Sequence, residues 1–428
     1  MAMVVDSLIR RVSRVPMRTP VLAVAAALLL ITPAHSQSPV RLDPAIAERL
    51  NPAQQRSYVE YLQARAGFER QLEMYWALVG ERRDHRRRKY AARVAFDAND
   101  YVAEQPPKYA GPALNSDIAK LVAVAKPPEP DVPLPGVADF LENARTQYGF
   151  FPEPTTEREF KRRYAIDALA AGLSKNQVIR VYALETGGQG TFDMQAGIDP
   201  ITRTGRPISS ALGYAQLLHA NSTSELVKHG EGFIQRLQAM AAHPSTQPAR
   251  AQSLQQKAAI LRRMLSAAKS VPNEWSQHQQ LGKTPLGLGI HALNMDADVG
   301  PWLQVLKLKG LLTTAASEAG RTALTGAELE LMNLAGPRTG LEMMEPVGRT
   351  MPTANFFAQG GYYRNTIVRE KTGAQLLAAL DERMEHGLKK PGAIEFAAVF
   401  DEITGPQSRA GVQAAPLAFG VNNLFGGR

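Results

Sequence analysis

The segment AKPPEPDVPLPG, residues 125–136, carries five prolines in twelve residues. Proline has no backbone N–H and a fixed φ, so such a segment resists both an α-helix and a central strand. We therefore predict a linker over residues 125–136. It divides an N-terminal region, residues 37–124, from a larger domain over residues 137–404.

Helical spacing dominates both parts of the chain, and alternating β-branched runs are scarce. The second part contains YAIDALAAGLSKNQVIRVYALETGG, which predicts two helices that break at Gly172. Ser174, followed by Gln177 three residues later, matches a capping box and predicts a helix over residues 175–185. The N-terminal region predicts one or two long helices between positions 43 and 93. The predicted fold class is mainly α.

The N-terminus has the pattern of a secretory signal peptide. Four arginines precede the apolar run VLAVAAALLLIT, and the small residues Ala34 and Ser36 follow it. A bilayer-spanning helix needs about 20 residues, so this run is too short to be an anchor. We predict a signal peptide over residues 1–36, a periplasmic or secreted protein, and no transmembrane segment in the mature chain. A glycine-rich tail without periodicity, residues 405–428, is predicted to be flexible.

Composition excludes several classes of site. The chain has no cysteine, which removes thiol nucleophiles, iron–sulfur clusters and thiolate zinc sites. The histidines lack zinc spacing, and Asp296 and Asp298 lack the spacing of a calcium loop, so we expect no metal and no cofactor. The formal net charge of +9 suits an anionic envelope polymer better than nucleic acid in an exported chain.

The most basic stretch is ERRDHRRRKYAAR, residues 81–93. It fits a solvated helix face, the interpretation that we favour, or a binding patch.

The stretch VYALETGGQG places Glu185 at the end of an apolar helical pattern and three glycines just after it. Glu185 falls at the edge of the apolar stripe formed by Leu173, Val178, Ile179, Tyr182 and Ala183, where a carboxylate is partly desolvated. Taken alone, the pattern also fits a solvated carboxylate beside a glycine C-cap.

A second motif begins 25 residues after Glu185, in SALGYAQLL, residues 210–218. A helical glutamate followed by G-A-x-G-L-M-Q is the signature of the lysozyme-like lytic transglycosylases, and this chain resembles it. Gly213 and Gln216 match the motif's second glycine and its glutamine, whereas Ser210 replaces its first glycine, and Tyr214 and Ala215 replace Leu-Met. MNLAGPRTG, residues 332–340, resembles the family's third motif, A-Y-N-A-G-P-G. There Asn333 and Leu334 occupy the positions of the tyrosine and the asparagine.

The resemblance covers roughly residues 160–385. It implies a lysozyme-like helical catalytic domain that acts on peptidoglycan glycan strands, with a helical pair inserted around residues 222–285. It also implies that Glu185 alone protonates the leaving oxygen and then deprotonates the C6 hydroxyl of N-acetylmuramic acid, which leaves a 1,6-anhydro end. Partial burial suits this role because it raises a carboxyl pKa.

Candidate substrate contacts are Gly213, Tyr214, Gln216, Asn333, Tyr362 and Tyr363. The two last tyrosines fit a sugar-stacking wall or core packing equally well. Glycines 187, 188 and 190 would let a polymer approach the acid without meeting side chains.

Two alternatives stay open. A hydrolytic muramidase would use Asp193 or Asp199 as a second carboxylate to position water, although both residues fit turn positions better. A non-catalytic envelope-binding or assembly protein would use the basic N-terminal helices to dock an envelope protein partner.

Overall fold

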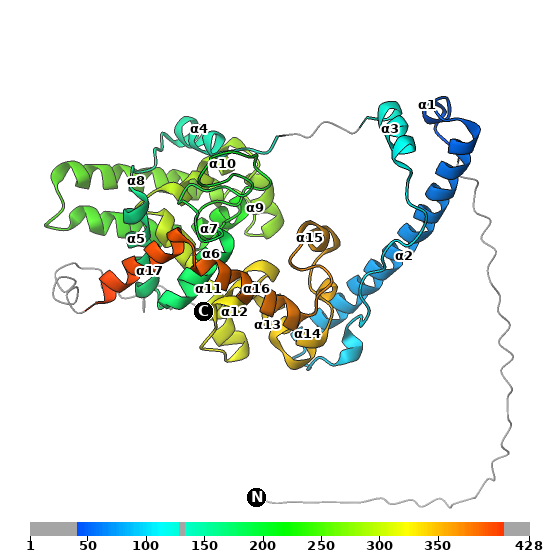
Figure 1. Ribbon diagram of the computed structural model, residues 1–428. Helices are drawn as coiled ribbons and strands as arrows, with labels where there is room; N and C mark the ends of the chain where they lie inside the picture. Colours follow the sequence, from blue (N-terminus) through cyan, green and yellow to red (C-terminus); the bar gives the residue numbers. More distant parts are fainter. Residues whose placement is uncertain (1–40, 128–132, 406–428) are drawn as a thin grey trace, which may run out of the picture.

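A computed structural model describes residues 41–127 and 133–405 (Figure 1). The predicted signal peptide, and the predicted tail from residue 406 on, lie outside the described residues. The described chain is mainly helical, which confirms the predicted fold class. Its strand-like pairing is limited to isolated bridges, such as those between Gln195 and Leu212 and between Ile198 and Gly205. No helix in this part of the chain is long and apolar enough to cross a bilayer.

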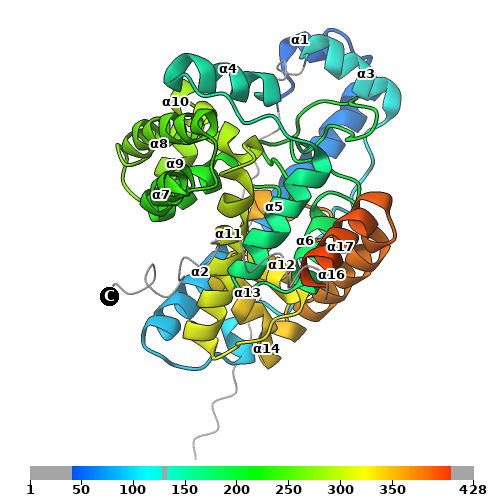
Figure 2. The same ribbon diagram turned by 90° about the vertical axis from the view of Figure 1, so that its left-hand side faces the viewer.

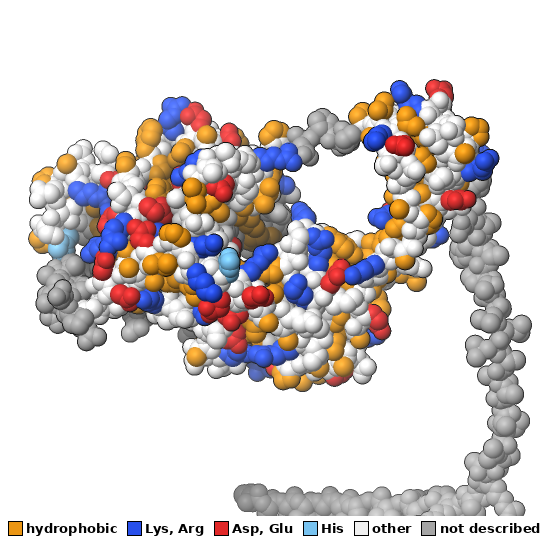
Figure 3. All heavy atoms as spheres, viewed as in Figure 1, with side chains coloured by type: hydrophobic (Ala, Val, Ile, Leu, Met, Phe, Trp, Pro, Cys, Tyr) orange, Lys and Arg blue, Asp and Glu red, His pale blue; other side chains and the backbone are white. Residues whose placement is uncertain are grey.

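The N-terminal region is an arm built on one long helix. Its elements are α1 (Pro44–Ala47), α2 (Pro52–Ala91), the short 3-10 helix η1 (Ala98–Asp100) and α3 (Ser116–Ala125). A small apolar cluster of Ile46, Leu50, Tyr58 and Ile118 holds α1 and α3 against the start of α2. This end of the arm projects from the body (Figure 1), and open space separates the two in the space-filling view of Figure 3.

The other end of α2 is fixed to the body by its basic stretch. Arg86, only 2% exposed, donates to the carbonyl oxygens of Asp100 and Asn355 at 2.9 and 2.8 Å, and its Nε lies 2.6 Å from a carboxylate oxygen of Glu342. Arg83 donates to Phe357 O at 2.8 Å. The favoured interpretation of a solvated face is therefore wrong for these two arginines, because carbonyl and carboxylate acceptors offset the cost of burying their charge.

The larger domain begins with α4 at Val137. Its elements are α4 (Val137–Tyr148), α5 (Glu157–Ala170), α6 (Lys175–Glu185), α7 (His219–Ala242), α8 (Pro248–Ala268), α9 (Trp275–Leu281), α10 (Pro285–His291), η2 (Ala292–Met295), α11 (Gly300–Ala319), α12 (Gly326–Ala335), α13 (Pro337–Met344), α14 (Pro346–Thr350), η3 (Thr353–Asn355), α15 (Gln359–Arg364), α16 (Gly373–Leu388) and α17 (Pro391–Thr404). The helices on either side of the predicted linker end at Ala125 and begin at Val137, so its bounds coincide with helix ends.

Helix α11 is shared between two apolar cores. Val305, Leu308 and Leu311 belong to a core with α5, α6, α12, α16 and α17, whereas Leu303 and Leu306 face a second core with α4, α7, α8 and α10. Figure 2 shows α11 between these two groups of helices. The helical pair predicted within residues 222–285 is present as the α7–α8 hairpin, which packs into the second core.

Candidate functional site

The helix that carries Glu185 has the predicted bounds. The Ser174 hydroxyl accepts from Gln177 N at 3.2 Å, and the Gln177 side chain accepts from Ser174 N at 2.9 Å, so the capping box is formed. The predicted stripe on this helix is buried in the first core. Glu185 is the last residue of α6 and is half-buried at the edge of that stripe.

Two residues of α12 meet the Glu185 carboxyl group. Asn333 Nδ2 donates to Glu185 Oε1 at 3.0 Å and lies 3.3 and 3.4 Å from the two carboxylate oxygens of Glu330. The Glu185 and Glu330 carboxyl groups lie near enough to influence each other's protonation. Two like charges in one buried site repel each other, so ionisation of both groups together is disfavoured.

Burial has the largest effect on the pKa values of Glu185 and Glu330. It raises the pKa of Glu185 from the ordinary 4.5 to about 7, against the opposing effects of Glu330, Asn333 and Lys307. Burial, followed by the charge of Glu185, holds the pKa of Glu330 well above its ordinary value. Glu330 is only 2% exposed, so Glu185 is the member of the pair that solvent or a ligand can reach.

Lys307, on α11, interacts electrostatically with both glutamates of this pair. Burial lowers the pKa of Lys307, while Glu225, Glu330 and Glu185 act to raise it. Its positive charge favours the ionised form of Glu185. A carboxyl group that gives up its proton here is therefore left beside a cation.

The other residues of the second motif have structural contacts. Tyr214 is 1% exposed, and its hydroxyl donates to the Glu157 carboxylate within a cluster of aromatic rings. A Cβ on Gly213, whose φ is +79°, would lie 2.6 Å from Gln304 Nε2. The expectation that Tyr214 and Gly213 face a substrate is thus corrected, because core packing covers both.

Gln216 is half-buried in the loop that follows, with its backbone at φ +42°. Its Nε2 donates to Met194 O at 3.1 Å and to Gly213 O at 2.8 Å. Among the described residues no hydrogen bond joins Gln216 to Glu185. Its amide braces the loop of residues 191–218.

Two of the glycines after Glu185 lie where packing leaves no room for a side chain. Gly188 has φ +75°, and a Cβ there would lie 2.1 Å from Gly387 O. A Cβ on Gly190 would lie 2.3 Å from Thr186 Cβ. Close approach to α16 therefore requires Gly188, and local packing against Thr186 requires Gly190. This corrects, for these two glycines, the expectation that they give a polymer access to the acid.

The tyrosines of α15 lie against the N-terminal arm. Tyr362 is buried; its ring lies 5.5 Å from that of Trp76, and its hydroxyl accepts from Glu370 N. Tyr363 is 38% exposed and lies 5.9 Å from the Trp76 ring. Of the two interpretations that the sequence left open, core packing holds for Tyr362, while Tyr363 keeps an accessible surface.

Among the described residues, no hydrogen bond or ion pair joins Asp193 or Asp199 to Glu185. Asp199 accepts from the backbone N–H groups of Ile201 and Thr202, which lowers its pKa and gives the turn contacts that the sequence favoured. Asp193 accepts from the Thr191 hydroxyl and pairs with Arg203 at 3.1 Å. Both carboxylates are occupied by local partners.

Sequence reasoning missed Glu330. It lies three residues before Asn333 in LELMNLAG, between Leu329 and Leu331, which are both fully buried. An ionisable residue between two leucines was the available signal, because a leucine on each side favours burial of this part of the helix.

The described residues contain no group of three or more side chains able to hold a metal ion. Asp296 and Asp298 instead share the Lys257 ammonium in a buried ion-pair network. On the face seen in Figure 3, basic and acidic side chains are interspersed.

Comparison with protein-family models, with curated proteins and with solved structures finds no match to this chain.

Proposed function

We propose that this protein is a peptidoglycan lytic transglycosylase of lysozyme-like fold, exported to the periplasm or beyond, with Glu185 as its single catalytic acid and base. The observation that carries the proposal is the contact between Asn333 and Glu185. It joins the first and third motifs of the family resemblance at one carboxyl group. The contact joins residues that lie 148 positions apart in the sequence.

The protonation of Glu185 supports the acid role. Cleavage of a glycosidic bond needs a proton on the leaving oxygen, and a carboxyl pKa of about 7 keeps the acid protonated in part of the molecules at neutral pH. After the proton leaves, Asn333 and Lys307 favour the carboxylate. The carboxylate can then remove the proton from the C6 hydroxyl as that oxygen closes on C1.

The carboxylate geometry favours the single-glutamate mechanism over a hydrolase. Paired carboxylates of glycosidases stand about 5 Å or more apart, on either side of the sugar, with the wider spacings leaving room for water. Glu330 is buried, and the amide that contacts it also contacts Glu185, so Glu330 has no place on the opposite side of a sugar ring. Asp193 and Asp199 are held by their own loop. The substrate's C6 hydroxyl therefore supplies the nucleophile that a hydrolase takes from water.

Mass spectrometry of soluble products from purified sacculi tests the reaction type. We expect 1,6-anhydro ends. Reducing ends would support the muramidase alternative at the same glutamate. Binding to sacculi without soluble products would support a non-catalytic envelope protein, in which the arm α1–α3 is the available surface for a partner.

A further inference from the structure

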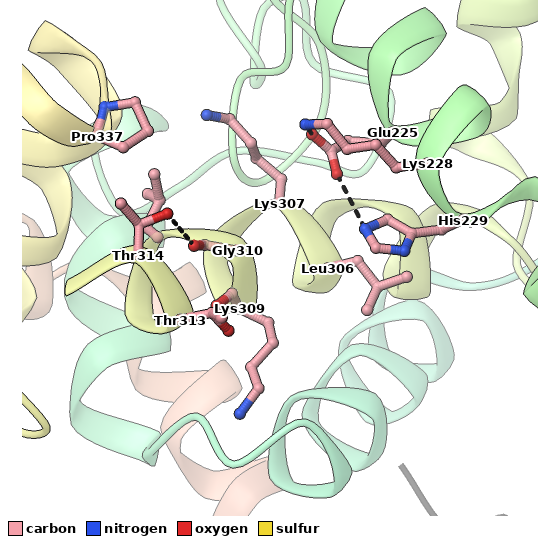
Figure 4. A pocket seen from close by; sticks show the side chains of 11 residues that line it. Glu225, Lys228, His229, Leu306, Lys307, Lys309, Gly310, Thr313, Thr314 and Pro337 are labelled. Atoms are coloured by element: carbon pink, nitrogen blue, oxygen red, sulfur yellow. Dashed lines mark hydrogen bonds and ion pairs between the residues drawn. The ribbon is translucent and has the colours of Figure 1, made fainter. Parts of the chain in front are cut away.

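A pocket lies between α11, α7 and the start of α13. Its volume is about 270 Å³, and its lining includes Glu225, Lys228, His229, Leu306, Lys307 and Pro337 (Figure 4). Lys307 connects the pocket to the site, because it lines the pocket and acts electrostatically on both Glu185 and Glu330. Pro337 belongs to the third motif, four residues after Asn333.

The charges in this pocket are not balanced. Glu225 is engaged by Lys228 at 2.9 Å and faces His229 at 3.5 Å. Lys307 makes no hydrogen bond, and no ion pair within 4.0 Å, with any described residue. In the view of Figure 4 its amine lies between Pro337 on one side and the Glu225–Lys228 pair on the other. The Lys307 ammonium thus has no counterion among the described residues, and a bound anion would supply one.

We propose that this pocket binds a carboxylate carried by the glycan strand, with Lys307 as the ammonium that receives it. The inference rests on the proposed function, because peptidoglycan offers such groups. N-acetylmuramic acid carries a lactyl ether that ends either in a free carboxylate or in a peptide with its own carboxylates. A carboxylate on Lys307 would hold the muramic residue beside Glu185, the position in which that sugar loses its leaving group.

Binding measured without cleavage tests the site. In a Glu185→Gln background, calorimetry would compare three soluble glycan fragments: with peptides, without peptides but with free lactyl carboxylates, and with every carboxylate converted to the methyl amide. We expect the amidated fragment to bind about tenfold more weakly than one or both of the acidic fragments. The tighter of the two acidic fragments identifies whether the lactyl or the peptide carboxylate is bound.

Variants at Lys307 separate a direct contact from general attraction. Lys307→Met should remove the preference for free carboxylates, and Lys307→Arg should retain most of it. Lys309→Met is the comparison variant, because Lys309 lies on the same helix and also lines the pocket, but its amine points away from that of Lys307 (Figure 4). It removes the same charge and should leave the preference intact. Equal loss in both methionine variants, or no loss in Lys307→Met, would overturn the assignment.

The outcomes distinguish this inference from the proposed function. If Glu185→Gln cleaves sacculi normally but Lys307→Met loses the carboxylate preference, the catalytic proposal fails and the binding site stands. If Glu185→Gln is inactive and Lys307→Met binds all fragments like its parent, only the binding site fails. A melting curve for each variant, with Lys307→Arg as the conservative partner, establishes that a loss of binding is not a loss of fold.

Discussion

Asn333 Nδ2 donates a 3.0 Å hydrogen bond to Oε1 of Glu185, and so ties the C-terminal part of α12 to the last residue of α6. The same amide lies within 3.4 Å of both oxygens of Glu330. One side chain therefore contacts both the proposed acid and the buried carboxyl group that accompanies it.

Asn333→Ala should lower turnover on sacculi by about 10²-fold, because the acid loses its orientation while keeping its proton. The amide stabilises the charged form of Glu185, so its removal raises the pKa of Glu185 further. The limb on which activity falls as pH rises should consequently move to higher pH. A pH–rate profile checks both effects, and an unmoved limb would contradict the role of the amide.

Glu330→Gln should change the pH dependence of stability. The folded protein holds protons on this pair that the unfolded chain releases near pH 4.5, so wild-type stability falls as pH rises from about 4.5 through about 7. A glutamine donates to Glu185 without ever ionising. We expect the variant to melt near wild type at pH 5 and above it at pH 8.

Glu69→Gln is the control for this comparison, because Glu69 lies exposed on α2. Its melting temperature should follow wild type at both pH values. If the melting temperature of Glu330→Gln also followed wild type at both pH values, the raised pKa values of Glu185 and Glu330 would have no support.

Arg86→Met should destabilise the junction between the arm and the body by about 3 kcal/mol, because it leaves the Glu342 carboxylate and the Asp100 carbonyl oxygen without this partner. The Asn355 carbonyl oxygen loses one donor and keeps Arg83. Arg87→Met is a matched control from the same basic stretch, with a side chain that is 72% exposed. Urea denaturation should detect the first change and find the second within about 0.5 kcal/mol of wild type. Equal, small effects would restore the solvated-face interpretation.

Gly188→Ala should be strongly destabilising, since its Cβ would meet Gly387 O in a backbone conformation that already disfavours a side chain. Gly187→Ala has the left-handed backbone but open space around the new methyl group, so it should cost only about 1 kcal/mol. Thermal denaturation compares the two. A Gly188→Ala protein of normal stability that fails to bind sacculi would instead favour the role of polymer access.

The elements predicted best from sequence were those fixed by local chemistry. The start of α6 depends on residues that are neighbours in sequence: the break at Gly172 and the capping box of Ser174 and Gln177. The structure confirms the predicted bounds of this helix. Tyr214, Arg86 and Glu330 could not be placed in this way. Their environments come from helices distant in sequence, so burial of Tyr214 or pairing of Glu330 with Glu185 depends on packing that no local pattern encodes. Sequence could single out Glu185 as the candidate acid, but not the buried Glu330 that accompanies it.

The most direct test of the central claim is the rate at which Glu185→Gln releases soluble products from purified sacculi, compared with wild type, Asp193→Asn and Asp199→Asn. Glutamine keeps the size of the side chain and can still pair with Asn333, but it has no proton to transfer. The account predicts that Glu185→Gln binds sacculi and melts like a folded protein but loses activity by about 10² to 10⁴-fold, while the two aspartate variants stay near wild type. Release of products by Glu185→Gln at the wild-type rate would contradict it.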